Sequence, residues 1–217
     1  MTTPSRSASR TAIVAAAVAS AVAYPFLPDR VATHFDAEGR PDGYSSRTSA
    51  AVRFPVMLLG IQVLNDRLGT WPGGRDRDDR DSGVRARDEA IALAELALLP
   101  AHLAILANGL GVRVDMSRVE RGVYAVLLVA LGNVLPKLPR NGLVGIRTPW
   151  TLADPAVWER THRLGGYLVT AAGLVSLATL PAGKRAARLP MAATLSAVGL
   201  SAVYSFVAYA RRPRSSR

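Results

Sequence analysis

The stretch Leu189–Ala210 reads LPMAATLSAVGLSAVYSFVAYA, 22 residues without a charged side chain. About 20 apolar residues in an α-helix cross the hydrocarbon core of a bilayer. Two further uncharged runs have a similar length, 18 residues at 11–28 and 20 residues at 164–183. A soluble domain in a chain of 217 residues does not need such runs, so they predict a membrane protein.

Three weaker apolar segments complete the set of predicted spans. Residues 90–112 are interrupted only by Glu95 and His102, and residues 122–136 are an uncharged run of 15 residues. Residues 54–65 are shorter, and extending them back to Thr48 brings in Arg53, whose aliphatic stem reaches the interface. The predicted fold is all-α, a polytopic bundle of six transmembrane helices in the lipid of a prokaryotic plasma membrane.

The distribution of Lys and Arg between the loops predicts the orientation of this bundle. With the N-terminus inside, 17 of the 27 basic residues lie on the cytoplasmic side and 10 lie outside. Because cytoplasmic loops carry the excess of Lys and Arg, both termini are expected in the cytoplasm. Ala21-Val22-Ala23 is a small-x-small pattern at which a signal peptidase cuts, but the apolar run continues to Leu27 and favours an uncleaved anchor.

Composition excludes several function classes. The chain has no cysteine, which rules out disulfides, thiolate zinc sites and thiol catalysis. Its net charge of +11 comes from basic residues spread between the apolar runs rather than gathered on one element, so direct binding of nucleic acid is not predicted. The motifs HExxH and GxSxG are missing, and His34, His102 and His162 fall on different segments. We therefore expect a protein that is not an enzyme and has no cofactor and no metal.

Three segments are expected along the chain. Residues 1–65 form an N-terminal module of two helices around an outer loop at 28–50. Residues 66–87 include the run RDRDDRD at 75–81 and are expected to be a solvated, charged cytoplasmic loop. Residues 88–217 form a C-terminal membrane domain.

Glu95 and His102 are ionisable residues within a predicted span. They are seven residues apart, so they lie about two helical turns apart on nearly the same face. Two interpretations follow. They form a proton or ion relay, or Glu95 simply meets an Arg near the cytoplasmic end while a neutral His102 is hydrogen-bonded within the bundle.

Two loops are dense in motifs. The outer loop reads LPDRVATHFDAEGRPDGYSSR at 27–47. The inner loop, which we define as residues 132–166, contains "GN-LPK", "N...GIRTPWTL" and "W..THR.GG" in that order. This series closely resembles the SdpI family of bacterial membrane proteins, and the outer loop resembles an N-terminal module of unknown function often fused to that family. The outer loop departs from the module's pattern in having Ala32 for proline, Asp36 for asparagine, Tyr44 for tryptophan and Arg47 for lysine.

The resemblance implies a function in immunity to a secreted toxin peptide. It implies an outer face that intercepts the peptide and an inner loop that relays its presence by sequestering a cytoplasmic transcriptional repressor. The outer loop is expected to fold into a cap, and its candidate ligand contacts are His34, Phe35, Asp36, Asp42 and Tyr44. The candidate partner-binding residues of the inner loop are Asn133, Pro136, Asn141, Gly145, Arg147, Thr148, Pro149, Trp150, Trp158, Thr161, His162 and Arg163.

The inner loop also has a geometry that follows from its residues alone. Asp154 before Pro155 predicts a helix that begins at Pro155, and Glu159 four residues before Arg163 predicts an ion pair. Trp158 and His162 are one turn apart and share a face of that helix. Arg147 is expected to pair with Glu159 or with a carboxylate of a partner. The alternative is that these residues only pin the loop against the bundle.

Two other functions remain open at this point. One is a small-solute or ion transporter that uses Glu95 and His102. The other is a membrane enzyme that acts on lipid or envelope precursors with His162 as acid or base.

Overall fold

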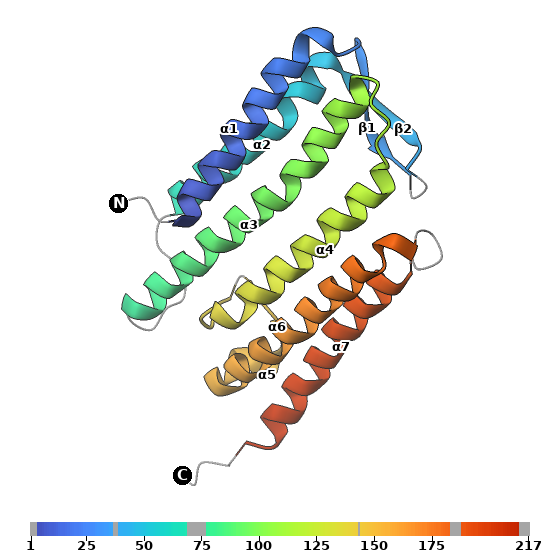
Figure 1. The fold of residues 1–217 in the computed structure, drawn as a ribbon. Coiled ribbons are helices and arrows are strands. Elements are labelled where there is room, and N and C mark those ends of the chain that lie inside the picture. Colours follow the sequence, from blue (N-terminus) through green and yellow to red (C-terminus); the bar gives the residue numbers. More distant parts are fainter. Residues whose placement is uncertain (1–3, 37–38, 69–76, 143, 183–187, 213–217) are drawn as a thin grey trace. The chain divides into compact units, whose positions relative to one another are not determined.

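The computed structural model describes residues 4–36, 39–68, 77–142, 144–182 and 188–212 (Figure 1). Within these ranges the chain is almost entirely helical, with one two-stranded antiparallel sheet. Helices of 19 to 33 residues follow from the long apolar runs and confirm the predicted all-α membrane bundle. The elements in chain order are α1 (Pro4–Ala23), η1 (Tyr24–Phe26), β1 (Arg30–Phe35), β2 (Pro41–Ser46), α2 (Arg47–Leu68), α3 (Arg77–Gly109), α4 (Met116–Val134), η2 (Leu135–Lys137), α5 (Pro149–Ala153), α6 (Pro155–Ala178) and α7 (Leu189–Ala210).

The chain divides into two compact units, which we describe separately. Unit 1 comprises Met1–Gly69 with Ile91–Leu127, and unit 2 comprises Thr70–Ala90 with Leu128–Arg217. Unit 1 therefore holds α1, α2, the sheet, the C-terminal part of α3 and the N-terminal part of α4. Unit 2 holds the inner loop with α5, α6 and α7.

In unit 1, α1 and α2 form an antiparallel pair closed by the β1–β2 hairpin. Ala12 and Ala16 on α1 are fully buried. Because their side chains are small, the neighbouring helices can approach α1 closely at these positions. Gly109 ends α3 where a Cβ atom would come within 2.8 Å of Leu27 and 3.1 Å of Val31, so a larger residue does not fit there. The hydrophobic core runs from these helix ends into the hairpin and includes Phe35.

The hairpin is the cap expected of the outer loop. Strand β1 pairs with β2 from Arg30 opposite Ser46 to Phe35 opposite Pro41, with irregular register on either side of His34. Gly39, in the turn region, has a φ of +78°, which suits glycine. The sequence predicts a folded cap here, but its two strands were not predicted.

In unit 2, α6 and α7 form the other antiparallel helix pair (Figure 1). Gly165 on α6 faces Ser201 on α7, where a Cβ atom would lie 3.2 Å from the Ser201 hydroxyl oxygen. Gly132 and Gly166 bring α4 and α6 together more tightly, since a Cβ on Gly132 would lie 2.7 Å from the Gly166 carbonyl oxygen. Small residues thus decide where these helices touch.

The expectation of a solvated loop over residues 66–87 is wrong at both of its ends. Helix α2 continues to Leu68 and α3 begins at Arg77, while residues 69–76 lie outside the described part of the chain. Oppositely charged residues spaced four apart stabilise an exposed helix, as with Asp81 before Arg85. The mixed charges therefore extend α3 instead of breaking it.

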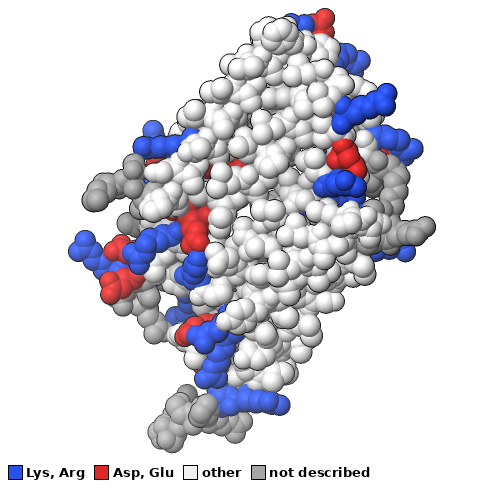
Figure 2. Space-filling view, viewed as in Figure 1, with Lys and Arg blue, Asp and Glu red and all other residues white. Residues whose placement is uncertain are grey.

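Five helices in the described ranges are long and apolar enough to cross a membrane: α1, α2, α3, α4 and α7. Their outward faces carry large apolar side chains such as Val14, Leu195 and Phe206, each more than half exposed. The face of the molecule in Figure 2 is largely uncharged, and most charged side chains lie toward its margins. The protein is thus a multi-pass membrane protein. Helix α6, which begins with charged turns, lies along α7 and remains our predicted sixth span.

We predict that Asp42 lies outside the cell and Asp78 lies in the cytoplasm. The chain has no cysteine, so a single cysteine at either position reports its own location. Asp42→Cys should react with an impermeant maleimide in intact cells, because the basic residues favour that orientation. Asp78→Cys should react only after the membrane is permeabilised. The reverse pattern of labelling would mean that the topology is inverted.

Candidate functional site

The inner loop is built around a stacked pair of aromatic rings on α6. Trp158 and His162 are one turn apart, as the sequence predicted, and their ring centroids lie 3.9 Å apart with planes inclined by 19°. Both side chains are buried, with exposed fractions of 3% and 1%. Asp154 caps the helix by accepting from the backbone N–H groups of Ala156 and Val157, which confirms the predicted start of the helix at Pro155.

The His162 ring joins two parts of the inner loop. Its Nδ1 lies 2.9 Å from the Trp158 carbonyl oxygen, and its Nε2 accepts from the backbone N–H of Ile146 at 3.0 Å. These contacts assign a neutral imidazole with its proton on Nδ1. Because both ring nitrogens are engaged with the backbone, His162 offers neither of them to a substrate in this arrangement.

Gly145 allows the Ile146 backbone to reach His162. Its φ is +123°, and a Cβ atom there would lie 2.3 Å from Nε2 of His162 and 3.1 Å from the Trp158 ring. No other residue type fits this position without moving the ring. Gly145 therefore has a structural role set by both its backbone angle and the space around it.

Two threonines close the turn that follows. The Thr151 hydroxyl is fully buried, accepts from the Thr148 N–H at 3.0 Å and donates to the Ile146 carbonyl at 2.8 Å. The Thr148 hydroxyl accepts from the Thr151 N–H and lies 3.1 Å from the Ser205 hydroxyl on α7. Sequence reasoning missed Thr151, although a hydroxyl residue three positions after Thr148 is the spacing of a capping box.

The first half of the loop is held by an asparagine and by the Trp158 indole. Asn141 is buried, donates to the carbonyls of Pro139 and Val144, and accepts from the Val144 N–H. The Trp158 Nε1–H donates to the Leu138 carbonyl at 2.8 Å. The end of α4 and the "LPK" turn η2 are tied to Glu89 of α3, whose Oε1 lies 3.0 Å from Asn133 Nδ2 and 2.6 Å from Lys137 Nζ. No sequence pattern predicted the contribution of Glu89, because the contact joins residues far apart in the chain.

The predicted inner-loop residues therefore fall into two groups. Asn141, Trp158, Thr161 and His162 are buried and form the packed interior of the loop. The others are exposed or half-buried: Asn133, Pro136, Gly145, Arg147, Pro149 and Arg163 are exposed, and Thr148 and Trp150 are half-buried. Arg163 pairs with Glu159, which confirms that predicted ion pair. The partner of Glu159 is therefore Arg163 and not Arg147.

Arg147 lies beside an apolar cavity of about 460 Å³ in unit 2. The cavity is bounded by the chain from Val144 to Thr148 and by side chains of α4, α6 and α7, including Leu131, Val169 and Val198. Trp150 packs edge-on against Phe206 of α7, with ring centroids 5.4 Å apart. A guanidinium next to an apolar cavity suits a partner that presents a carboxylate together with an apolar side chain.

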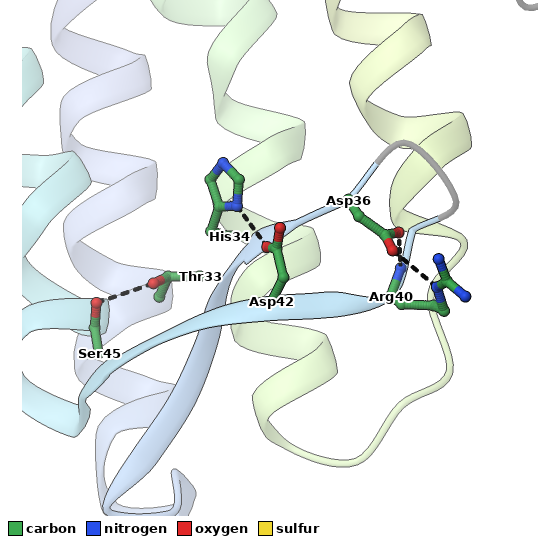
Figure 3. A network of polar contacts seen from close by, with 6 residues as sticks. All are labelled: Thr33, His34, Asp36, Arg40, Asp42 and Ser45. Carbon is green, nitrogen blue, oxygen red and sulfur yellow. Dashed lines mark hydrogen bonds and ion pairs between the residues drawn. The ribbon is translucent and has the colours of Figure 1, made fainter.

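The outer candidates lie on the hairpin in unit 1 (Figure 3). Phe35 is 7% exposed and belongs to the core, whereas Tyr44 is 52% exposed with the Arg30 guanidinium 5.4 Å from its ring centre. Asp36 accepts from the backbone N–H and the Nε of Arg40, both at 2.8 Å. His34 and Asp42 face each other across the strands and share a hydrogen bond. Within the described residues, no three His, Asp or Glu side chains gather as a metal site.

The His34–Asp42 contact has an electrostatic consequence. The hydrogen bond to Asp42, followed by the charge of that carboxylate, raises the pKa of His34 above its ordinary value. The protonated imidazole is therefore the form that the hairpin favours. Both side chains are exposed, so they are accessible from solution.

Comparison with known proteins finds similarity in two parts of the chain. Residues 137–209 match the model of the SdpI/YfhL protein family, and residues 11–59 match DUF1648, a domain of unknown function. The chain is 26% identical over 163 residues to the immunity protein SdpI of Bacillus subtilis (strain 168), which covers 72% of each chain. No solved structure matches the chain. The C-terminal part of the chain is thus similar to the SdpI/YfhL protein family, and a segment similar to DUF1648 precedes it.

Proposed function

We propose that this protein protects a bacterial membrane against a membrane-active toxin peptide. The observation that carries the proposal is the similarity to the immunity protein SdpI, which extends over 72% of both chains. The family match contains the inner loop from Lys137 onward, including the His162 network. The hairpin is the surface that we assign to the peptide, because it exposes Tyr44, His34 and Asp42 beside a buried core.

We further propose that the inner loop relays the presence of the toxin to a cytoplasmic repressor. Arg147 is the residue we assign to this contact, because its guanidinium is exposed beside the apolar cavity and pairs with no carboxylate of the described chain. The buried His162 network would keep the loop in one of two arrangements. A toxin bound outside changes repressor affinity only if it favours one arrangement over the other.

The structure gives less support to the two alternative functions. A relay between Glu95 and His102 needs a continuous path of polar groups, but Ala12 and Ala16 on α1 and Leu58 on α2 are apolar and fully buried. Acid–base catalysis by His162 needs a free ring nitrogen, and both are engaged with the backbone. We therefore favour the immunity function.

Survival of a toxin-sensitive bacterium tests the proposed protection. Cells that express the protein should survive a panel of membrane-active peptides better than cells that carry an empty vector. Phe35→Ala should weaken protection, because removing this buried ring costs about 3 kcal/mol of packing in the hairpin. Tyr44→Ala should leave the hairpin folded, so a loss of protection there would assign the exposed ring to toxin contact. Equal killing with and without the protein across the panel would refute the proposal.

The His34–Asp42 pair should make the hairpin more stable in mild acid. Since the folded pKa of His34 is raised, its contribution is fully present below the ordinary histidine pKa and is lost as pH rises through the raised value. Asp42→Asn should lower the His34 pKa measured by NMR titration of the imidazole. Asp29→Asn is a matched control, since Asp29 pairs with Arg47 instead. An unchanged His34 pKa in Asp42→Asn would contradict the assigned pair.

Arg147→Ala should abolish capture of the repressor while protection is largely retained. The variant removes only an exposed guanidinium, so the network of Gly145, Thr151 and His162 stays in place. Co-purification with a transcriptional repressor supplied as a tagged protein measures capture, and immunoblotting of membranes measures insertion. Arg160→Ala is the control, because it removes an equally exposed charge from α6. If Arg147→Ala instead removed the protein from the membrane, the loop would be a scaffold and the relay assignment would be wrong.

A further inference from the structure

Glu95 is a carboxyl group buried inside unit 1. It lies in the apolar part of α3 and is 1% exposed. An ionised carboxylate at membrane depth is costly unless a cation or several hydrogen-bond donors compensate its charge. The groups around Glu95 therefore decide which protonation state the bundle accepts.

The contacts of Glu95 are with neutral groups. Gln62 on α2 places its single amide nitrogen 3.4 Å from both carboxyl oxygens, at the long end of hydrogen-bond range. Ser9 on α1 is 1% exposed, and its hydroxyl faces the same carboxyl without reaching the geometry of a full hydrogen bond. An acid proton on Glu95 would supply the donor that this buried hydroxyl oxygen lacks.

The charged groups on the three helices are committed elsewhere or exposed. Arg6 on α1 lies 3.6 Å from Asp66 on α2, and Arg10 and Arg67 are exposed. Along α3 itself, Asp88 lies 3.8 Å from Arg87, and Glu89 pairs with Lys137. No ion pair joins Glu95 to a Lys, Arg or His of the described chain.

His102, two turns further along α3, has a partner of its own. The Ser20 hydroxyl donates its one proton to the Ala51 carbonyl at 2.6 Å. The Ser20 oxygen also lies 2.8 Å from Nε2 of His102, so the Nε2–H of the imidazole is the donor in that contact. A doubly protonated imidazole would also need a hydrogen-bond acceptor at Nδ1, and the Nδ1 of His102 has no partner in the described residues. His102 is thus a neutral ring stacked on Phe54 and is not a counter-ion for Glu95.

We propose that Glu95 is an intramembrane proton-binding site, held as a neutral carboxylic acid by Ser9 and Gln62. In this arrangement the acid O–H donates to the Ser9 oxygen, and the Gln62 amide donates to the other carboxyl oxygen. Release of the proton leaves an uncompensated carboxylate between α1, α2 and α3, which favours separation of α3 from the α1–α2 pair or entry of water. The site binds and releases a proton in place, because Glu95 and His102 have separate partners, Gln62 for Glu95 and Ser20 for His102. This inference does not rest on toxin protection.

Labelling with dicyclohexylcarbodiimide tests the proposal on the full chain in liposomes. The reagent partitions into membranes, and the O–H of a neutral acid adds across its C=N bond. The resulting O-acylisourea rearranges to a stable N-acylurea that retains the mass of one carbodiimide. Mass spectrometry should find this adduct on Glu95, with a rate that falls about tenfold per pH unit above the midpoint of titration. Glu95→Gln should abolish the adduct, and Glu89→Gln should retain it.

Infrared spectroscopy provides a readout that does not depend on access of the reagent. The wild-type protein should show the C=O stretch of a neutral carboxylic acid that is absent in Glu95→Gln and present in Glu89→Gln. Glu95→Gln should also keep the thermal stability of the wild type at neutral pH, because the amide is close in shape to the neutral acid. A missing C=O band at neutral pH, or an adduct on Glu95 whose rate ignores pH, would overturn the proposal.

Discussion

The double engagement of His162 is the interaction on which the inner loop depends. One imidazole links the backbone of α6 at Trp158 to the backbone of the preceding turn at Ile146. That link requires glycine at position 145, because any side chain there would occupy the space of the ring. It also places Trp158 where its indole holds the Leu138 carbonyl. The motif residues thus form one network in which each position limits its neighbours.

The two units meet the same physical demand in different ways. A bilayer supplies no water to satisfy buried polar groups, so each of them needs a partner within the protein. In unit 2 the non-helical chain between α4 and α6 is satisfied by Asn141, Thr148 and Thr151. In unit 1 the polar side chains of regular helices form small clusters, such as Ser20 with His102. Small residues, alanine on α1 and glycine on α6, let the helices approach closely enough for these contacts.

The motif residues differ in burial, and this difference decides which of them a partner can contact. Residues that form the most distinctive part of the motif, Trp158 and His162 among them, are buried and define the shape of the inner loop. The groups available to a partner are those that the network displays, above all Arg147 beside the apolar cavity. On the hairpin, likewise, Phe35 supports the fold while His34, Asp42 and Tyr44 remain exposed. In each unit a buried aromatic residue supports an exposed polar surface.

Much of the fold could be predicted from the sequence, because apolar length and local helix signals depend only on neighbouring residues. The uncharged runs determined the membrane helices, Asp154 with Pro155 determined the start of α6, and the four-residue spacing determined the Glu159–Arg163 pair. Only the tertiary structure decided that residues 77–87 extend α3, that the outer loop pairs as strands, and that Glu95 meets Gln62 rather than an Arg. The same holds for which motif residues are buried and which are exposed. Local signals cannot decide these points, because each depends on a contact between segments that only packing brings together.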